Sequence, residues 1–292
     1  MRFEGVYTAL VTPFAGDGSV DWKALRRLVD FQVDGGVAGL VPVGTTGESP
    51  TLEGGECREV IRVVVEQARG RVPVIAGAGS NCTAEAVHYA KDAKEAGAQA
   101  TLQVTPYYNK PTPDGLLQHF RAVADAVDLP LVVYNIAGRT GKNIENPVML
   151  ELAKHPRIRA VKEASGDINQ VMDLIAAKPA DFAVLSGDDN LVYPIMTLGG
   201  TGVISVASNL VPDRMSRFVG ALLKGDIASA RRMHYELLPL FRAIFVETNP
   251  IPIKAALAMK GLIAENYRLP MCPLAPKNRE KLSSVLKDLR LA

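Results

Sequence analysis

The chain has 292 residues, of which 48% are hydrophobic, and its formal net charge is +2 at pH 7. That length fits one large α/β barrel or two ordinary domains, and the apolar content is enough for a sizeable core. The near-neutral charge, with basic residues scattered along the chain, argues against a nucleic-acid or membrane-surface partner. No apolar run reaches the roughly 18 residues that a bilayer-spanning helix needs.

The first residues contain no long apolar segment, so we expect no secretory signal. The three cysteines, Cys57, Cys82 and Cys272, are few and odd in number, which fits a reducing cytosol without a disulfide framework. The four histidines are spread along the chain without the spacing of metal ligands, so we expect no catalytic metal. These patterns predict a cytoplasmic protein.

Short runs rich in strand-forming residues alternate with helical patterns over about the first 220 residues, the size of a TIM barrel. The expected strands are 6–11, 39–43, 72–76, 100–104, 131–134, 158–162, 183–186 and 202–206. A helical pattern follows each of them, so the chain contains eight β/α units. This order predicts a TIM (β/α)8 barrel that forms a catalytic domain over residues 1–224.

From Ile227 onward the pattern turns purely helical, through 252–259 and a last helix near 278–289. We expect residues 225–292 to form a C-terminal α-helical extension of the barrel and not a second catalytic domain. The alternative architecture is an open doubly wound sheet, which shares the alternation of strands and helices. Closure is favoured because the chain has eight such units and no convincing nucleotide-binding loop.

A single lysine, Lys162, ends the sixth expected strand. Alternation of side chains along the strand puts Ile158, Ala160 and Lys162 on one face, which is apolar and carries small residues. Desolvation on such a face disfavours the ammonium form and lowers the lysine pKa, and a neutral lysine is a nucleophile for carbonyl carbons. The simpler alternative is a solvated lysine paired with Glu163 or Asp167, because most lysines are exposed.

In a TIM barrel the catalytic groups lie at the carboxyl ends of the strands. In this chain those ends combine one lysine with several hydroxyls, and they supply neither a Ser-His-Asp triad nor a pair of carboxylates. The residues are Thr12, 44–48, 77–79, Tyr107, Tyr108, Tyr134, Asn135, Lys162, Gly187, Asp188 and Ser205. This composition suits imine chemistry, in which a neutral Lys162 attacks a ketone and hydroxyls move the protons as water leaves.

Two glycine-containing loops leave other interpretations open. The Gly-Thr-Thr-Gly turn at 44–47 is compatible with simple turn chemistry or with phosphate binding through backbone amides, but it lacks the Gly-Lys-Ser/Thr ending of a P-loop. The segment 77–79 hints at a dinucleotide fingerprint, but Cys82 stands where the third glycine is expected. An NAD-binding or non-catalytic barrel rests on this feature alone.

Six segments, in order along nearly the whole chain, resemble the dihydrodipicolinate synthase family, a group of pyruvate-dependent class I aldolases related to N-acetylneuraminate lyase. The segments are GLVPVGTTGE at 39–48, PYYNKP at 106–111, YNI with RTG at 134–141, KEASG at 162–166, SGDD at 186–189 and NPIP at 249–252. The resemblance implies a lyase that forms a Schiff base between pyruvate and Lys162. The enamine would then add to L-aspartate-4-semialdehyde in lysine and diaminopimelate biosynthesis, without a further cofactor.

The same resemblance implies roles for single residues. Tyr134 would be the acid and base, with Thr45 and Tyr108 in a proton relay. Tyr108 would reach into the site of a neighbouring subunit, which implies an obligate dimer, alone or within a homotetramer. Arg139 would bind the semialdehyde carboxylate, because a guanidinium fork suits two oxygens. The residues implied to contact pyruvate are Thr46, which would hold its carboxylate, Gly187 and Ile204.

Two residues beside the expected semialdehyde site depart from the family pattern. The family usually has proline where this chain has Ala137, and often serine where it has Gly138. Glycine adds backbone freedom next to Arg139, so we expect an elevated KM for the semialdehyde. A sialic acid or sugar-acid lyase would share Lys162 and Tyr134, but Arg139 and the second threonine of the turn favour the synthase.

Other positions match those that bind inhibitory lysine in feedback-sensitive relatives. They are Ser49, Asn81, Glu85 and Tyr107. Three further positions of that pattern carry different residues, where an alanine and two histidines are often found. They are Pro50, Gly54 and Cys57. Glu85 is able to meet the amine of lysine, but two polar partners are missing, so we expect weak or absent feedback inhibition.

Overall fold

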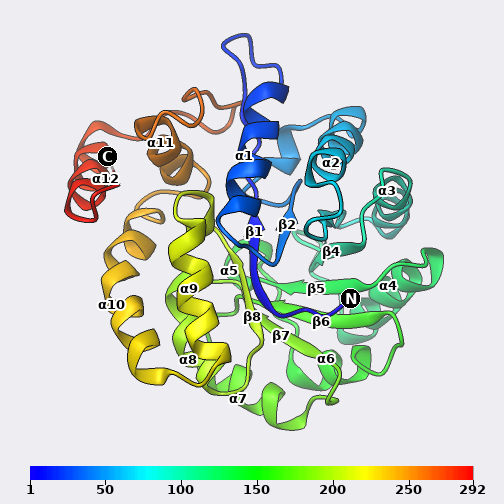
Figure 1. Ribbon diagram of the computed structural model, residues 1–292. Helices are drawn as coiled ribbons and strands as arrows, with labels where there is room; N and C mark the ends of the chain where they lie inside the picture. The colour runs from blue at the N-terminus through cyan, green and yellow to red at the C-terminus, as the bar shows by residue number, and fades with distance from the viewer. Residues whose placement is uncertain (292) are drawn as a thin grey trace.

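The computed structural model describes residues 1–291. Its eight strands, each parallel to its neighbours, form the centre of the molecule, and helices surround them (Figure 1). The strands are β1 (Gly5–Ala9), β2 (Gly39–Val41), β3 (Ile75–Gly77), β4 (Ala100–Val104), β5 (Leu131–Asn135), β6 (Ile158–Glu163), β7 (Ala183–Ser186) and β8 (Gly202–Ser205). Their order in the sheet is β2-β1-β8-β7-β6-β5-β4-β3.

The two ends of this order also meet, so the sheet closes on itself. An isolated parallel bridge joins Leu40 to Val74 between β2 and β3. Two backbone hydrogen bonds continue it: the amide of Leu40 donates to the carbonyl of Pro73 at 3.0 Å, and that of Gly77 to Pro42 at 2.9 Å. The TIM barrel predicted from the sequence is therefore confirmed, and the open sheet is wrong.

Helices follow the strands around the barrel (Figure 1). They are α1 (Trp22–Asp34), α2 (Gly54–Ala68), α3 (Thr83–Glu95), α4 (Pro113–Ala126), α5 (Ala137–Thr140), α6 (Asn146–Leu152), α7 (Ile168–Ala177), α8 (Val192–Thr197) and α9 (Pro212–Leu223), with short 3₁₀ turns η1 (Ser49–Thr51), η2 (Asp189–Leu191) and η3 (Ala207–Asn209). Local signals set their starts. For example, the carboxylate of Asp21 accepts a hydrogen bond from the amide of Ala24 at 2.9 Å and caps α1.

Apolar side chains fill both the barrel interior and the layer between strands and helices. The strict alternation expected along β6 is wrong at its first residue. Ala160 packs inside the barrel, but Ile158 packs outside it together with Val161. The pairing of β5 with β6 shifts at Leu131 and Val132, and such an irregularity turns a side chain to the other face.

The last helices are α10 (Ile227–Ala243), α11 (Ile251–Met259) and α12 (Pro276–Asp288). They lie together on one side of the barrel, where α10 packs on α9 and α12 packs on both α10 and α11 (Figure 1). The expected C-terminal helical extension is confirmed, and the domain boundary between 224 and 225 stays a prediction. None of the helices within residues 1–291 is long and apolar enough to cross a membrane.

Candidate active site

Lys162 lies on β6 and is only 5% exposed. Burial lowers the pKa of Lys162 to about 8. The carboxylates of Asp188 and Asp189 oppose this lowering, whereas the positive charge of Arg139 contributes to it. The solvated alternative is wrong, because the side chain is buried and both suggested partners are engaged elsewhere. Glu163 accepts hydrogen bonds from Asn135 and Ser165, and Asp167 caps the first turn of α7.

Tyr134 stands beside this lysine. The two residues are register partners on β5 and β6, and the Nζ of Lys162 lies 4.0 Å from the centroid of the Tyr134 ring. Burial raises the pKa of Tyr134 well above its ordinary value; Asp188 acts in the same direction, whereas Arg139 and Thr45 oppose it. The phenol therefore keeps its proton at neutral pH.

Gly187 packs directly against the stem of the lysine. A Cβ at this position would lie 2.7 Å from the Cβ of Ala164 and 3.2 Å from the Cε of Lys162, so a larger residue would displace the nucleophile. Ile204 is fully buried at the end of β8, among the side chains inside the barrel. The role of both residues as walls of a pyruvate pocket stays a prediction.

The loop between β2 and η1 carries Thr45 and Thr46 and bends sharply. Val43 and Glu48, which flank it, have φ of 58° and 56°, a left-handed conformation that is rare for residues other than glycine. Within residues 1–291 the backbone amides of Thr45 and Thr46 donate no hydrogen bond to the protein. Free amides in a sharp turn favour an anionic group. The same turn packs so closely on β3 that only glycine fits at position 77, because a Cβ there would lie 2.1 Å from the carbonyl oxygen of Val43.

Arg139 lies on the short helix α5, which the sequence analysis did not anticipate. Its Nη2 donates a hydrogen bond to the backbone carbonyl of Asn249 at 3.2 Å. The side-chain amide of Asn249 also donates to the hydroxyl of Thr46 at 2.9 Å. Asn249 therefore connects Arg139 and Thr46, two predicted substrate-binding residues, through its backbone carbonyl and its side chain. Asn249 belongs to the NPIP segment, but no role for it could be predicted from the sequence, because its partners are distant in sequence.

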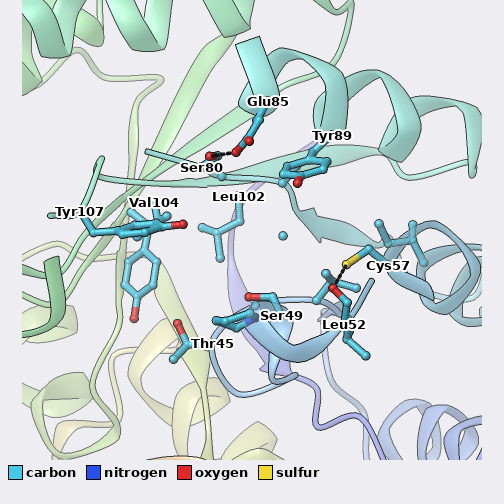
Figure 2. Close-up of a pocket in the computed structure, with 18 of the residues that line it drawn as sticks. Thr45, Ser49, Leu52, Cys57, Ser80, Glu85, Tyr89, Leu102, Val104 and Tyr107 are labelled. Atoms are coloured by element: carbon cyan, nitrogen blue, oxygen red, sulfur yellow. Dashed lines mark hydrogen bonds between the residues drawn. The ribbon is translucent and has the colours of Figure 1, made fainter. Parts of the chain in front are cut away.

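Residues predicted to act in catalysis or substrate binding and residues predicted to form a regulatory lysine site line the same cavity, which has a volume of about 510 Å³. Thr45, Tyr134 and Arg139 line it together with Ser49, Glu85 and Tyr107, and Figure 2 shows labelled members of both groups around the same space. Lys162 does not line the cavity, but its amine lies against the ring of Tyr134, and Tyr134 does line it.

The predicted regulatory residues have their own hydrogen bonds. The hydroxyl of Ser80 donates to the carboxylate of Glu85 at 2.7 Å (Figure 2). The amide of Asn81 donates to the carbonyl of Tyr107 at 3.1 Å, and Asn81 does not line the cavity. Of the departing positions, Pro50 and Cys57 line the cavity, and burial raises the pKa of the Cys57 thiol to about 11.

Tyr108 differs from the other predicted catalytic residues, because it does not line the cavity of its own chain. It is 90% exposed, and its φ of 70° is left-handed. A bulky residue in this conformation is uncommon, and such outliers concentrate at functional sites. The structure therefore brings Lys162, Tyr134 and Thr45 together but leaves Tyr108 on the surface.

Two further features of the site were not assigned from the sequence. The carboxylate of Asp189 accepts hydrogen bonds from the hydroxyl of Ser205 and the amides of Val206 and Ala207, at 2.6–3.0 Å, and so ties η2 to the end of β8. Burial raises its pKa to about 6. The second feature is a buried lysine, Lys254, which is the one charged residue in the apolar helix α11. A single charged residue within an otherwise apolar helical run could have marked Lys254 from the sequence.

No group of three or more histidine, cysteine, aspartate or glutamate side chains within residues 1–291 is arranged to hold a metal ion. The expectation of no catalytic metal stays a prediction.

A (β/α)8 barrel with a buried lysine on β6 facing a tyrosine on β5 has the architecture of the lysine-dependent aldolases. The model of the dihydrodipicolinate synthetase family matches residues 2–289. The chain belongs to this family, which confirms the resemblance seen in its motifs.

Similar proteins agree with this assignment. A 4-hydroxy-tetrahydrodipicolinate synthase from Koribacter versatilis is 55% identical over 289 residues, which cover 99% of this chain and 96% of that protein. The structure of chloride-inhibited dihydrodipicolinate synthase from Acinetobacter baumannii, complexed with pyruvate, is 44% identical, with a TM-score of 0.97 and 99% coverage of both chains. A monomeric dihydrodipicolinate synthase variant is 41% identical, with a TM-score of 0.98 and coverage of 99% and 98%.

Proposed function

We propose that this chain is a 4-hydroxy-tetrahydrodipicolinate synthase, a lyase that condenses pyruvate with L-aspartate-4-semialdehyde in lysine and diaminopimelate biosynthesis. Membership of the family and the names of its relatives support the reaction. The observation that carries it is the buried amine of Lys162, held against the ring of Tyr134. Such an amine loses its proton readily and is then a nucleophile for a ketone.

In the first half-reaction, the neutral Nζ of Lys162 attacks the ketone carbon of pyruvate. A C–N bond forms as the C=O π bond opens, and the carbonyl oxygen takes a proton from Tyr134. The new ammonium nitrogen then returns a proton to the phenolate of Tyr134, which gives a neutral carbinolamine. Water then leaves with a second proton, which passes through Thr45 and Tyr134 in the proposed relay, and an iminium remains. The iminium withdraws electrons from the adjacent methyl group, so a methyl proton passes to the phenolate of Tyr134, which restores the phenol and gives the enamine. The free amides of Thr45 and Thr46 would hold the pyruvate carboxylate during these steps.

In the second half-reaction, the enamine carbon attacks the aldehyde carbon of the semialdehyde, and the aldehyde oxygen takes a proton from Tyr134. The amino group of the semialdehyde then attacks the iminium carbon, closes the ring and releases Lys162. Arg139, which lines the cavity, would bind the semialdehyde carboxylate through two N–H groups. The cycle needs no cofactor beyond the covalent Schiff base.

We further propose that a second copy of the chain completes each site with Tyr108, in a dimer or a homotetramer built from two dimers. The exposure of Tyr108 and its left-handed backbone support this, because the phenol is presented outward and away from its own cavity. That a relative is described as a monomeric variant implies that assembly occurs in the family.

Complementation between two inactive variants tests this assembly. Chains with Lys162→Met and chains with Tyr108→Phe, co-expressed with different tags, form mixed dimers in which one site has an intact lysine and an intact partner phenol. We expect the mixed dimers to recover activity that neither variant has alone. Purified mixed dimers that stay as inactive as the parents contradict the proposal.

We also propose a cytoplasmic location, which the three free cysteines support. The partners proposed are small molecules and further copies of the chain, with neither nucleic acid nor membrane among them.

The reaction is tested by a coupled assay with pyruvate, aspartate semialdehyde and the reductase that consumes the product. We expect turnover that requires both substrates. Cleavage of N-acetylneuraminate or of a sugar acid, without turnover in the coupled assay, would assign the chain to a different lyase activity of the same kind of barrel.

A further inference from the structure

The sharp turn that carries Thr45 and Thr46 is anchored by the C-terminal helices. Its two flanking residues, Val43 and Glu48, are both left-handed without being glycine. Such conformations cost free energy and persist only where the surrounding structure holds them. On the barrel side, the hydroxyl of Thr12 donates to the carbonyl of Gly47 at 2.7 Å. The remaining support comes from residues about 200 positions later in the chain.

The central contact is an ion pair between Glu48, at the end of the turn, and Lys254, on α11. Their side chains are 1% and 0% exposed. The ammonium also lies 4.3 Å from the centroid of the Phe14 ring and 5.2 Å from that of Tyr267, so it is enclosed by aromatic rings. The second carboxylate oxygen of Glu48 has no hydrogen-bond partner within the described residues.

Stability alone is a poor explanation for this pair. Removing two charges from water is expensive, and well-packed apolar residues of similar volume are often as stable or more so. A buried pair does, however, fix geometry, because each charge has only one acceptable position. Here the backbone amide of Glu48 donates to the carbonyl of Thr45 at 3.1 Å, so anchoring of the glutamate side chain is passed to the turn itself.

Neighbouring contacts act on the same segment. Asn249, two residues before the start of α11, donates its side-chain amide to the hydroxyl of Thr46. Arg268, beyond α11, donates to the carbonyl of Thr51 at 2.8 Å and to both carboxylate oxygens of Glu56 at 2.6 Å. The C-terminal region thus contacts both Thr46 within the turn and the segment that follows the turn, and Glu48 lies between these contacts in the sequence.

We propose that Glu48 and Lys254 are positioning residues that hold the backbone amides of Thr45 and Thr46 in place for the carboxylate of the keto acid. The inference rests on the proposed function, because it concerns the same site. Neither residue lines the cavity, so both act through the turn. Loss of either partner leaves a buried group unmatched, the turn relaxes, and keto-acid binding weakens while Lys162 keeps its own surroundings.

The test compares Lys254→Met, Glu48→Gln and the double variant with wild type and with a control, Arg279→Gln. The control removes another C-terminal ion pair, in which Arg279 donates to both oxygens of Glu265. The readouts are the KM for pyruvate, the KM for the semialdehyde, the rate at which borohydride traps pyruvate on Lys162, and the midpoint of thermal unfolding.

We expect the single variants to raise the KM for pyruvate by about tenfold or more and to slow trapping, which is the scale of effect seen when positioning is lost. The KM for the semialdehyde should change less. The double variant has no unpaired charge, so it should regain thermal stability and still keep the raised KM. Arg279→Gln should lower the unfolding midpoint without a change in either KM.

A double variant that folds and binds pyruvate as wild type does, within twofold, would show that the pair serves only the core. The double variant therefore tests the positioning proposal even if a single variant fails to fold. If wild type itself forms no adduct with pyruvate, the proposed function has failed, and that outcome is distinct from failure of the positioning proposal.

Discussion

The Nζ of Lys162 lies 4.0 Å from the centroid of the Tyr134 ring, and the two residues are direct partners across β5 and β6. An aromatic face attracts an ammonium ion, by about 0.5–2 kcal/mol. Burial acts in the opposite direction and is the larger effect, because the pKa of Lys162 is lowered to about 8. The pairing therefore places a proton donor next to an amine that loses its charge easily.

Replacing Lys162 with methionine should abolish activity and stabilise the fold. A pKa lowered from 10.5 to about 8 means that the unfolded chain binds this proton more tightly than the folded one. The charged lysine therefore lowers the free energy of unfolding by about 3 kcal/mol below pH 8, and this destabilisation fades as the pH rises towards 10.5. Urea unfolding at pH 7 should show Lys162→Met as the more stable protein, with a smaller difference at pH 10. A less stable variant at pH 7 would contradict the account.

Removing the phenol of Tyr134 should slow the chemistry without harming the fold. General acid and base groups contribute about 10²- to 10⁴-fold, so we expect Tyr134→Phe to lower kcat within that range with little change in either KM. Tyr7→Phe is the matched control, because Tyr7 is another buried tyrosine of the barrel and its hydroxyl bonds to the carbonyl of Arg2. A drop in kcat that is equally large in both variants would mean that packing and not proton transfer was lost.

A side chain at position 138 should tighten the semialdehyde site. Gly138 lies in α5 beside Arg139, and a Cβ there would meet no atom within 4 Å. Alanine favours a helix over glycine by about 0.5–1 kcal/mol, so we expect Gly138→Ala to lower the KM for the semialdehyde about two- to fivefold. The KM for pyruvate should stay constant. Gly220→Ala, at an equally open position in α9, should change neither. An unchanged semialdehyde KM in Gly138→Ala would discard the loose-clamp hypothesis.

Lysine should inhibit this enzyme weakly or not at all. Glu85 is already bonded to Ser80, and the amide of Asn81 is bonded to the backbone of Tyr107. The thiol of Cys57, with its raised pKa, is only a weak donor. Steady-state assays should show no half-inhibition at sub-millimolar lysine, and Cys57→His should increase the sensitivity. Strong inhibition of the wild-type enzyme would show that the remaining polar groups suffice.

The parts of the site that local patterns encode were predictable from the sequence. Tyr134 and Lys162 end strand-like runs and Thr45 follows one, and the carboxyl ends of barrel strands meet at one face. The fold was predictable for a similar reason, since eight strand and helix patterns recur in order. Strand limits differ by a few residues, as in β2, which ends at Val41 and not at Val43. The strained turn begins there and ends the pairing.

The contacts between distant segments were not predictable. Glu48 and Lys254 are 206 positions apart, and Asn249 and Thr46 are 203 apart, so no periodicity or motif spacing connects them. The C-terminal helices were expected to be an extension of the barrel, and they are, but they also contact the loop that carries Thr45 and Thr46. The exposure of Tyr108 likewise depends on how its loop folds and not on its neighbours in sequence.

The central claim is that the uncharged amine of Lys162 condenses with pyruvate. Trapping with borohydride over a pH series, followed by peptide mapping, tests it most directly. We predict a single adduct on Lys162, whose initial rate of formation rises with pH about a midpoint near 8 as the amine loses its proton. An adduct on another lysine, no adduct, or a rate that does not change between pH 7 and pH 9 would contradict it.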